Sequence, residues 1–100
     1  MSSVSFAELS LMGSVSGDQV QAVLKDYVDS GASISAPIVI AVIDRSEPSP
    51  DHLQAMVDDA CRGAADQKRR RFEDSAAHYE LVASHCKALA RHHFIANAPA

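Results

Sequence analysis

Residues 69–94 contain most of the side chains in this sequence that could bind a metal ion. The segment RRRFEDSAAHYELVASHCKALARHHF holds four of the five histidines and one of the two cysteines. Ligands on one helix must lie three or four residues apart, because only those side chains share a face within reach of one ion. His78, His85 and His92 are spaced by seven, which is about 10 Å along a helix axis. The spacing therefore predicts no metal or cofactor site within one helix, and leaves open a site shared between two subunits.

The same segment offers Cys86, next to His85, as a candidate nucleophile. Adjacent residues of a helix point about 100° apart, and Cys86 falls on an apolar stripe where burial would raise the pKa of its thiol. The sequence also lacks a GxSxG elbow, a glycine-rich phosphate loop and an HExxH motif. We therefore expect a protein that is not an enzyme.

A single basic cluster could bind nucleic acid, and it consists of Lys68, Arg69, Arg70 and Arg71. Acidic residues four positions away on a helix can neutralise it, pairing Asp66 with Arg70, Arg69 with Glu73, and Arg70 with Asp74. The chain as a whole has a net charge of -4, which disfavours a generally basic nucleic-acid binder. A solvated helix surface is the favoured interpretation, and nucleic-acid binding through residues 68–71 is the alternative.

The clearest element that must position these residues is a helix over 17–30. Ser16 followed by Gln19 is a capping-box pattern, and Gly31 is typical of a left-handed helix end. Apolar residues then recur on one helical face, at Val20, Val23, Leu24, Tyr27 and Val28.

The segment 36–43 can be a buried strand or a short helix. Five of the six residues from Ile38 to Ile43 are β-branched, which favours a strand, while Ser35 and Pro37 could open a helix. A strand would need the tail as its partner, giving a small βαβ unit and an α+β fold. We accordingly expect residues 1–16 to be a flexible or edge-strand tail.

Residues 50–96 form a long helical region. Ser49 can cap it and Pro50 can be its first residue, but an unbroken helix would be about 70 Å long, against about 30 Å for a small domain. Residues 66–71 include no apolar side chain, so they are a bend between two antiparallel helices, with Asp74 or Ser75 capping the second, or a projecting part of one extended helix.

Composition agrees with one mainly α-helical domain over 17–100. The 100 residues are 47% hydrophobic and 22% charged, which suits a folded chain. The longest apolar run, at 38–43, is too short to cross a bilayer, and the N-terminus lacks the features of a secretory signal. We expect a cytoplasmic protein with Cys61 and Cys86 reduced.

The function predicted from these features is a non-catalytic protein–protein interaction module, such as an adaptor, a chaperone-like protein or a regulatory subunit. A coiled-coil-like apolar stripe would form the interface of a homodimer or contact an unidentified protein partner. The predicted interface residues are Phe72, Ala76, Tyr79, Ala83, Cys86 and Ala90. The alternative is a small nucleic-acid-binding regulator.

Overall fold

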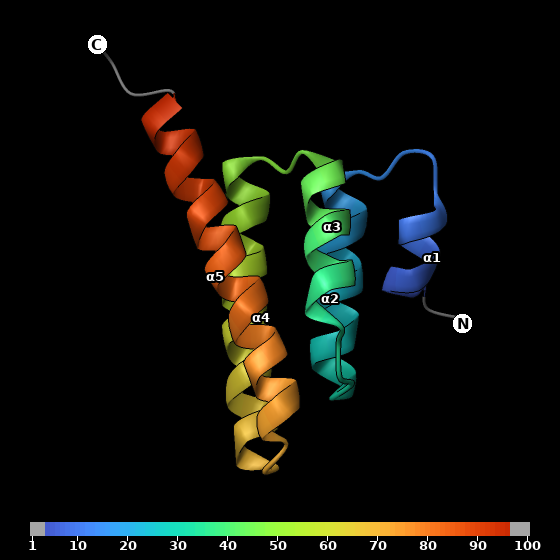
Figure 1. The fold of residues 1–100 in the computed structure, drawn as a ribbon, viewed down its shortest axis with the longest axis vertical. Helices are drawn as coiled ribbons and strands as arrows, with labels where there is room; N and C mark the ends of the chain where they lie inside the picture. Colours follow the sequence, from blue (N-terminus) through green and yellow to red (C-terminus); the bar gives the residue numbers. More distant parts are fainter. Residues whose placement is uncertain (1–3, 97–100) are drawn as a thin grey trace.

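The computed structural model describes residues 4–96 and contains five helices and no strand within that range (Figure 1). The helices are α1 (Phe6–Leu11), α2 (Gly17–Ser30), α3 (Ala36–Ser46), α4 (Pro50–Arg69) and α5 (Glu73–Ala96). The predicted mainly α-helical fold is confirmed. Across the described residues, no helix combines the length and the hydropathy that crossing a membrane requires.

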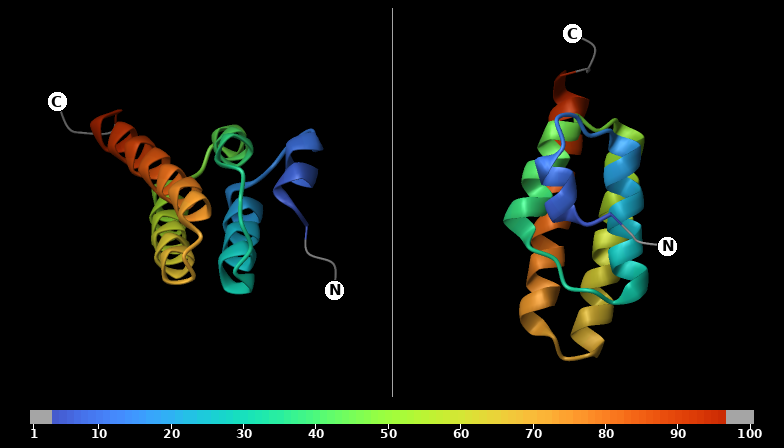
Figure 2. Two further views of the ribbon diagram at one scale, coloured as in Figure 1. Left: turned by 60° about the horizontal axis from the view of Figure 1, so that its bottom comes forward. Right: turned by 90° about the vertical axis from the view of Figure 1, so that its right-hand side faces the viewer.

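Helices α2 to α5 form an up-and-down four-helix arrangement of two antiparallel hairpins (Figure 1). Helix α2 packs against α4, and α3 packs against α5. The short helix α1 contacts α2 and α3 on the side away from the α4–α5 hairpin (Figure 2). One side of α5 therefore faces the bundle, and its opposite side is left at the surface.

Helix α2 begins and ends where the sequence predicts. The Ser16 side chain accepts a hydrogen bond from the Gln19 backbone N–H at 3.2 Å, and Gln19 Oε1 accepts one from the Ser16 N–H at 2.9 Å. Gly31 ends the helix at φ 73°, a left-handed conformation that glycine adopts without the penalty of a Cβ. The capping box and the glycine stop are both confirmed.

The preference for a strand at 36–43 is wrong, because this segment lies in helix α3. Its candidate strand partner, the tail, forms helix α1 instead of an edge strand, so residues 4–96 contain no βαβ unit. A helix satisfies its backbone groups internally and needs no paired strand. One face of α3 buries Val39, Val42 and Ile43, and Pro37 lies in its first turn.

Helix α1 anchors the N-terminal segment to the bundle. Ser5 caps it by accepting a hydrogen bond from the Glu8 N–H, and Phe6 and Leu9 are buried. The rings of Phe6 and Tyr27 have their centroids 4.9 Å apart, and the Phe6 N–H donates to the Tyr27 hydroxyl at 3.3 Å. Residues 1–3 of the predicted tail lie outside the described range.

The region 50–96 is a helical hairpin, so of the two alternatives the extended helix is wrong. Ser49 caps α4 and Pro50 is its first residue, as predicted. The chain reverses at 70–72, where Arg71 has a left-handed φ of 66°. The predicted cap at Asp74 or Ser75 is wrong, because α5 already begins at Glu73.

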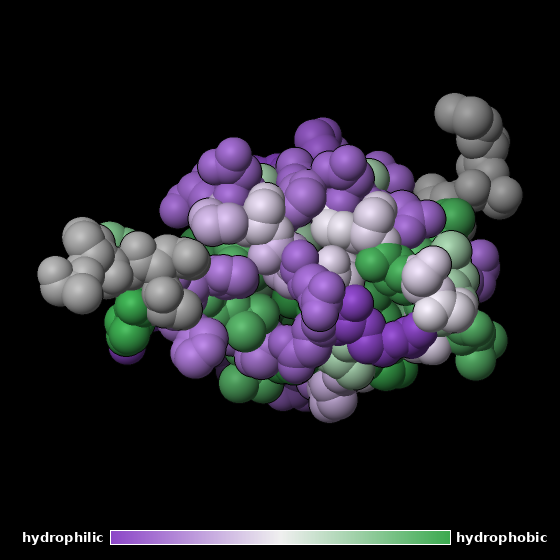
Figure 3. Space-filling view, turned by 90° about the horizontal axis from the view of Figure 1, so that it is seen from above, coloured by the Kyte–Doolittle hydropathy of each residue, from purple (hydrophilic) through white to green (hydrophobic). Residues whose placement is uncertain are grey.

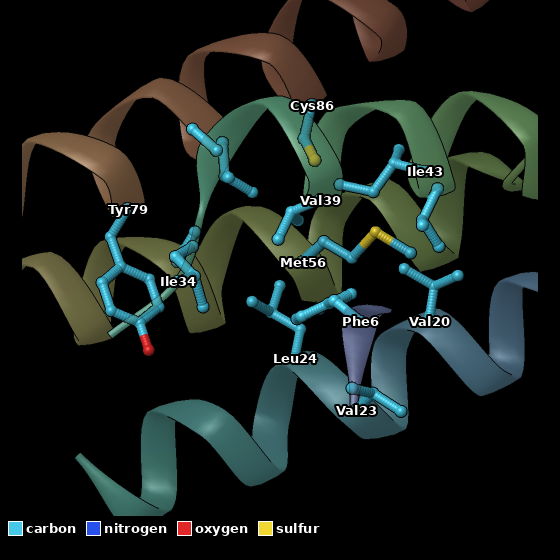
Figure 4. Close-up of a cluster of buried hydrophobic side chains, with 14 of the residues drawn as sticks. Phe6, Val20, Val23, Leu24, Ile34, Val39, Ile43, Met56, Tyr79 and Cys86 are labelled. Carbon is cyan, nitrogen blue, oxygen red and sulfur yellow. The ribbon is translucent and has the colours of Figure 1, made fainter. Parts of the chain in front are cut away.

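All five helices contribute to one hydrophobic core (Figure 4). Met56 of α4 lies in its middle, with Leu24, Val39 and Ile43 around it. Cys86 of α5 points into the same cluster (Figure 4). The inward side of α5 is thus part of the interior of a single chain.

Candidate functional site

The structure places most of the predicted interface residues inside the chain. Ala76, Tyr79, Ala83 and Cys86 are each at most 4% exposed, and the last three belong to the hydrophobic core of the bundle. Phe72 stands apart from them at the α4–α5 turn, where its side chain is 54% exposed, and Ala90 is only half-buried. This stripe is a core-facing surface, so a second chain could reach it only if the bundle opened.

Tyr79 shows how the inward side of α5 is satisfied within the chain. Its hydroxyl donates a 2.6 Å hydrogen bond to the carbonyl of Ala32, and its ring lies against Gly63 of α4. Burial, with the charge of Asp66 as a smaller cause, raises the pKa of Tyr79 to about 12. The phenol is therefore a neutral, structural group.

Cys86 is unsuited to be a nucleophile in this fold. Its side chain is fully buried, and burial raises the pKa of the thiol to about 12, with the charge of Asp44 adding to the shift. A thiol of that pKa carries almost no thiolate at neutral pH. Cys61, by contrast, is exposed on α4.

Two of the three evenly spaced histidines connect α5 to α3. His78 Nδ1 accepts a hydrogen bond from the backbone N–H of Ala36 at 3.0 Å, and His85 Nε2 lies 2.7 Å from Asp44 Oδ1. The seven-residue spacing thus matches the two ends of α3. Among residues 4–96, no three histidine, cysteine or acidic side chains are grouped closely enough to hold a metal ion.

His52 connects the beginnings of α4 and α2. It occupies the third position of a capping box, where its Nδ1 accepts a hydrogen bond from the Ser49 N–H at 3.2 Å. The proton of the neutral ring is then on Nε2, which lies 2.7 Å from Asp18 Oδ1. This role was not predicted from the sequence, because the third residue of a capping box is usually Glu or Gln.

Three of the four basic side chains of the cluster form ion pairs with neighbouring carboxylates. Lys68 pairs with Glu80 of α5 at 2.8 Å, and Asp66 pairs with both Arg69 at 2.9 Å and Arg70 at 3.2 Å. Of the predicted pairs, Asp66 with Arg70 is confirmed. The pairs of Arg69 with Glu73 and Arg70 with Asp74 are wrong, because α4 ends at Arg69 and the four-residue helical spacing does not continue across the turn.

A cleft of about 670 Å³ lies where the α4–α5 turn meets the α2–α3 loop. Arg71, Glu73 and Asp74 line it, so one basic and two acidic side chains stand together around the cleft. Ser75 Oγ is buried there without a hydrogen-bond partner among the residues that the structure describes. The cleft can admit a small polar molecule, but its lining selects no ligand class.

The exposed side of α5 carries a second stripe, which we call the outer stripe. Its members are Ala77, Leu81, Ser84, Ala88 and Ile95. From Ala77 to Ala88 they follow the alternating four- and three-residue spacing of a coiled-coil face, Ile95 lies seven residues after Ala88, and all five are exposed. Leu81 is 55% exposed and Ile95 is 66% exposed. In the view from above, hydrophobic surface is visible at the end of the molecule where α5 finishes (Figure 3, left).

The outer stripe was overlooked at the level of sequence, although a signal for it exists. Leu81, Ala88 and Ile95 are seven residues apart. Tyr79 and Cys86 have the same spacing on the inward stripe, which is the core-facing stripe of α5. This seven-residue recurrence of apolar residues is the sequence signal for the second stripe. Comparisons with family models, with curated proteins and with solved structures find no match to this chain.

Proposed function

We propose that this protein is a non-catalytic protein–protein interaction module that binds its partner through the outer stripe of α5. The observation that carries the proposal is an exposed helix face with coiled-coil spacing on a helix whose other face is already buried in the core. Roles as an adaptor, a regulatory subunit or a chaperone-like protein would all use such a surface.

The composition of the outer stripe suits contact with another helix. Leu81 and Ile95 offer apolar side chains for burial, at about 25 cal/mol per Å² of apolar area removed from water. Ala77, Ser84 and Ala88 are small, so a partner helix can approach α5 closely. Small residues alternating with a few large apolar ones are a surface for packing rather than for chemistry.

The placement of the reactive side chains also supports a non-catalytic role. Cys86 is a buried, protonated thiol, while His78 and His85 bond to α3. These groups hold the bundle together and leave α5 as a rigid support for its outer stripe. The sequence predicts either a second copy of the chain or an unidentified protein as the partner. Both are compatible with that surface.

The proposal is tested by placing a charge in the outer stripe. We expect Leu81→Glu to abolish capture of the natural partner from cells of the native host, because the carboxylate would have to be buried in the complex. Leu11→Glu is the matched control, because Leu11 is 87% exposed on α1, far from the outer stripe. Equal capture by both variants and the wild type would contradict the proposal.

A further inference from the structure

The charges on the exposed side of α5 reverse sign along the helix. Asp74 and Glu80 lie in its N-terminal half, and Lys87 and Arg91 lie in its C-terminal half. All four residues are exposed. We infer that the partner of the outer stripe is a second copy of this chain, with the two α5 helices antiparallel; this inference rests on the proposed function.

The positions of these charges match the flank and the line of the outer stripe. Glu80 and Lys87 directly precede Leu81 and Ala88, so they share one flank of the stripe, as residues of a coiled coil that form pairs between helices do. Asp74 lies seven residues before Leu81 and continues the stripe toward the N-terminus. Arg91 lies seven residues after Ser84, within the stripe between Ala88 and Ile95.

One antiparallel register pairs all four of these charges, while Ile95 extends beyond the first residue of the partner's α5. It sets Leu81 of one copy opposite Ser84 of the other, so that the larger side chain meets the smaller one. The same offset places Ala77 opposite Ala88, Asp74 opposite Arg91, and Glu80 beside Lys87. Two-fold symmetry makes each contact twice, and such an isologous pair closes without recruiting a third chain.

The opposite orientation is disfavoured by the same charges. In a parallel pair, Asp74 would face its own counterpart, and so would Arg91, which sets like charges together along the interface. The antiparallel pair instead brings every acidic residue of this set to a basic one. Electrostatic complementarity therefore selects both the partner and its direction.

The charged groups are available for pairing between chains. Within residues 4–96, Asp74, Lys87 and Arg91 form no ion pair. Glu80 pairs with Lys68 on its own chain, and its side chain remains 51% exposed. Because a single helix pair with small side chains buries a limited area, we expect a dissociation constant on the order of micromolar.

The test uses two charge-reversed variants and sedimentation velocity across the micromolar range. The variant Asp74→Lys/Glu80→Lys has four basic side chains along the interface, and Lys87→Glu/Arg91→Glu has four acidic ones. We expect the wild type to dimerise, each variant alone to stay monomeric, and their equimolar mixture to dimerise. A wild type that stays monomeric, or a mixture that does not associate, would overturn the inference.

The direction of the helices is tested by disulfide formation in a Cys61→Ser background, which removes the exposed native thiol. Mixing Ala77→Cys chains with Ala88→Cys chains should give mainly the mixed disulfide in an antiparallel pair. Disulfides joining two Ala77→Cys chains instead would indicate a parallel pair and overturn the inference.

Failure of this inference can be told apart from failure of the proposed function. The wild type could be monomeric on its own while Leu81→Glu fails to bind a different protein that Leu11→Glu still binds. That result would support the interaction module and show that a second copy is not its partner. If Leu81→Glu changes neither dimerisation nor capture of any protein, both fall.

Discussion

His78 Nδ1 of α5 lies 3.0 Å from the backbone nitrogen of Ala36 and accepts the hydrogen bond of the first residue of α3. Ser35, at the N-cap position of α3, makes no capping hydrogen bond with its own side chain. A histidine from a distant part of the sequence therefore does what a local cap usually does. The beginning of α3 depends on the presence of α5.

Replacing His78 by alanine should lower the free energy of unfolding by about 1–2 kcal/mol, because the Ala36 N–H loses its acceptor. His78→Asn should recover much of this loss, since the asparagine side-chain oxygen can occupy the position of Nδ1. Urea unfolding of the three proteins measures both effects.

His85→Ala is the control for this prediction. Its bond to Asp44 joins two partly exposed side chains, and such pairs contribute less than about 1 kcal/mol. A loss for His85→Ala as large as that for His78→Ala, or no recovery with asparagine, would show that His78 acts through general packing.

Gly63 gives a prediction that runs against helix propensity. Alanine in place of a mid-helix glycine usually stabilises by about 1 kcal/mol. A Cβ at Gly63 would lie 2.8 Å from the Tyr79 ring and 3.1 Å from a Val28 methyl group, so Gly63→Ala should destabilise the bundle, by about 1–3 kcal/mol. Thermal unfolding measures the difference, with Gly13→Ala as the control because no atom lies within 4 Å of a Cβ there.

Local signals in the sequence were enough to predict where α2 and α4 begin. Ser16 and Ser49 each bond to the backbone three residues ahead, and Gly31 ends α2 in a left-handed conformation. These interactions join residues within one turn of each other. The sequence alone therefore contains the information that they need.

The state of residues 36–43 could not be predicted, because it depends on distant residues. The β-branched run fits a strand. In the fold the segment is helical, because His78 accepts a hydrogen bond at its first residue and α1 covers one of its sides. The inward stripe of α5 posed the same difficulty. Its apolar spacing predicts a buried face, but only the fold shows that Gly63 and Ala32 of the same chain cover Tyr79.

The ion pairs of residues 66–70 predict weak binding to nucleic acid. We expect little binding to mixed duplex DNA at moderate salt, because Asp66 and Glu80 already form ion pairs with three of the four basic side chains and offset two of their charges. Asp66→Asn/Glu80→Gln should raise the affinity at low salt by releasing those cations. Fluorescence anisotropy at two salt concentrations measures both proteins.

The contrary result would favour a nucleic-acid-binding regulator. A wild type with micromolar, steeply salt-dependent affinity would support that function if replacing Arg69, Arg70 and Arg71 by glutamine abolished the binding.

Cys86 should make the protein lose stability in alkaline solution. Its pKa is about 12 in the folded chain, against an ordinary value of 9.0, so the unfolded chain releases this proton first. The contribution of the protonated thiol to the free energy of unfolding is fully present below pH 9 and is lost as the pH rises toward 12. At pH 10 the free energy of unfolding is lower by about 1.4 kcal/mol. Tyr79, raised from 10.0 to about 12, adds a smaller loss at that pH.

Urea unfolding at about pH 8 and pH 10 separates the two groups. Cys86→Ala should be less stable than the wild type at pH 8, because a buried side chain is truncated, but its stability should fall less between the two pH values. Tyr79→Phe should remove only the smaller contribution.

In the folded wild type, a thiol reagent should modify Cys61 promptly and Cys86 only as fast as the bundle unfolds. An equal alkaline loss in the wild type and Cys86→Ala, together with rapid modification of both thiols, would show that Cys86 is accessible and that its burial does not control the alkaline transition.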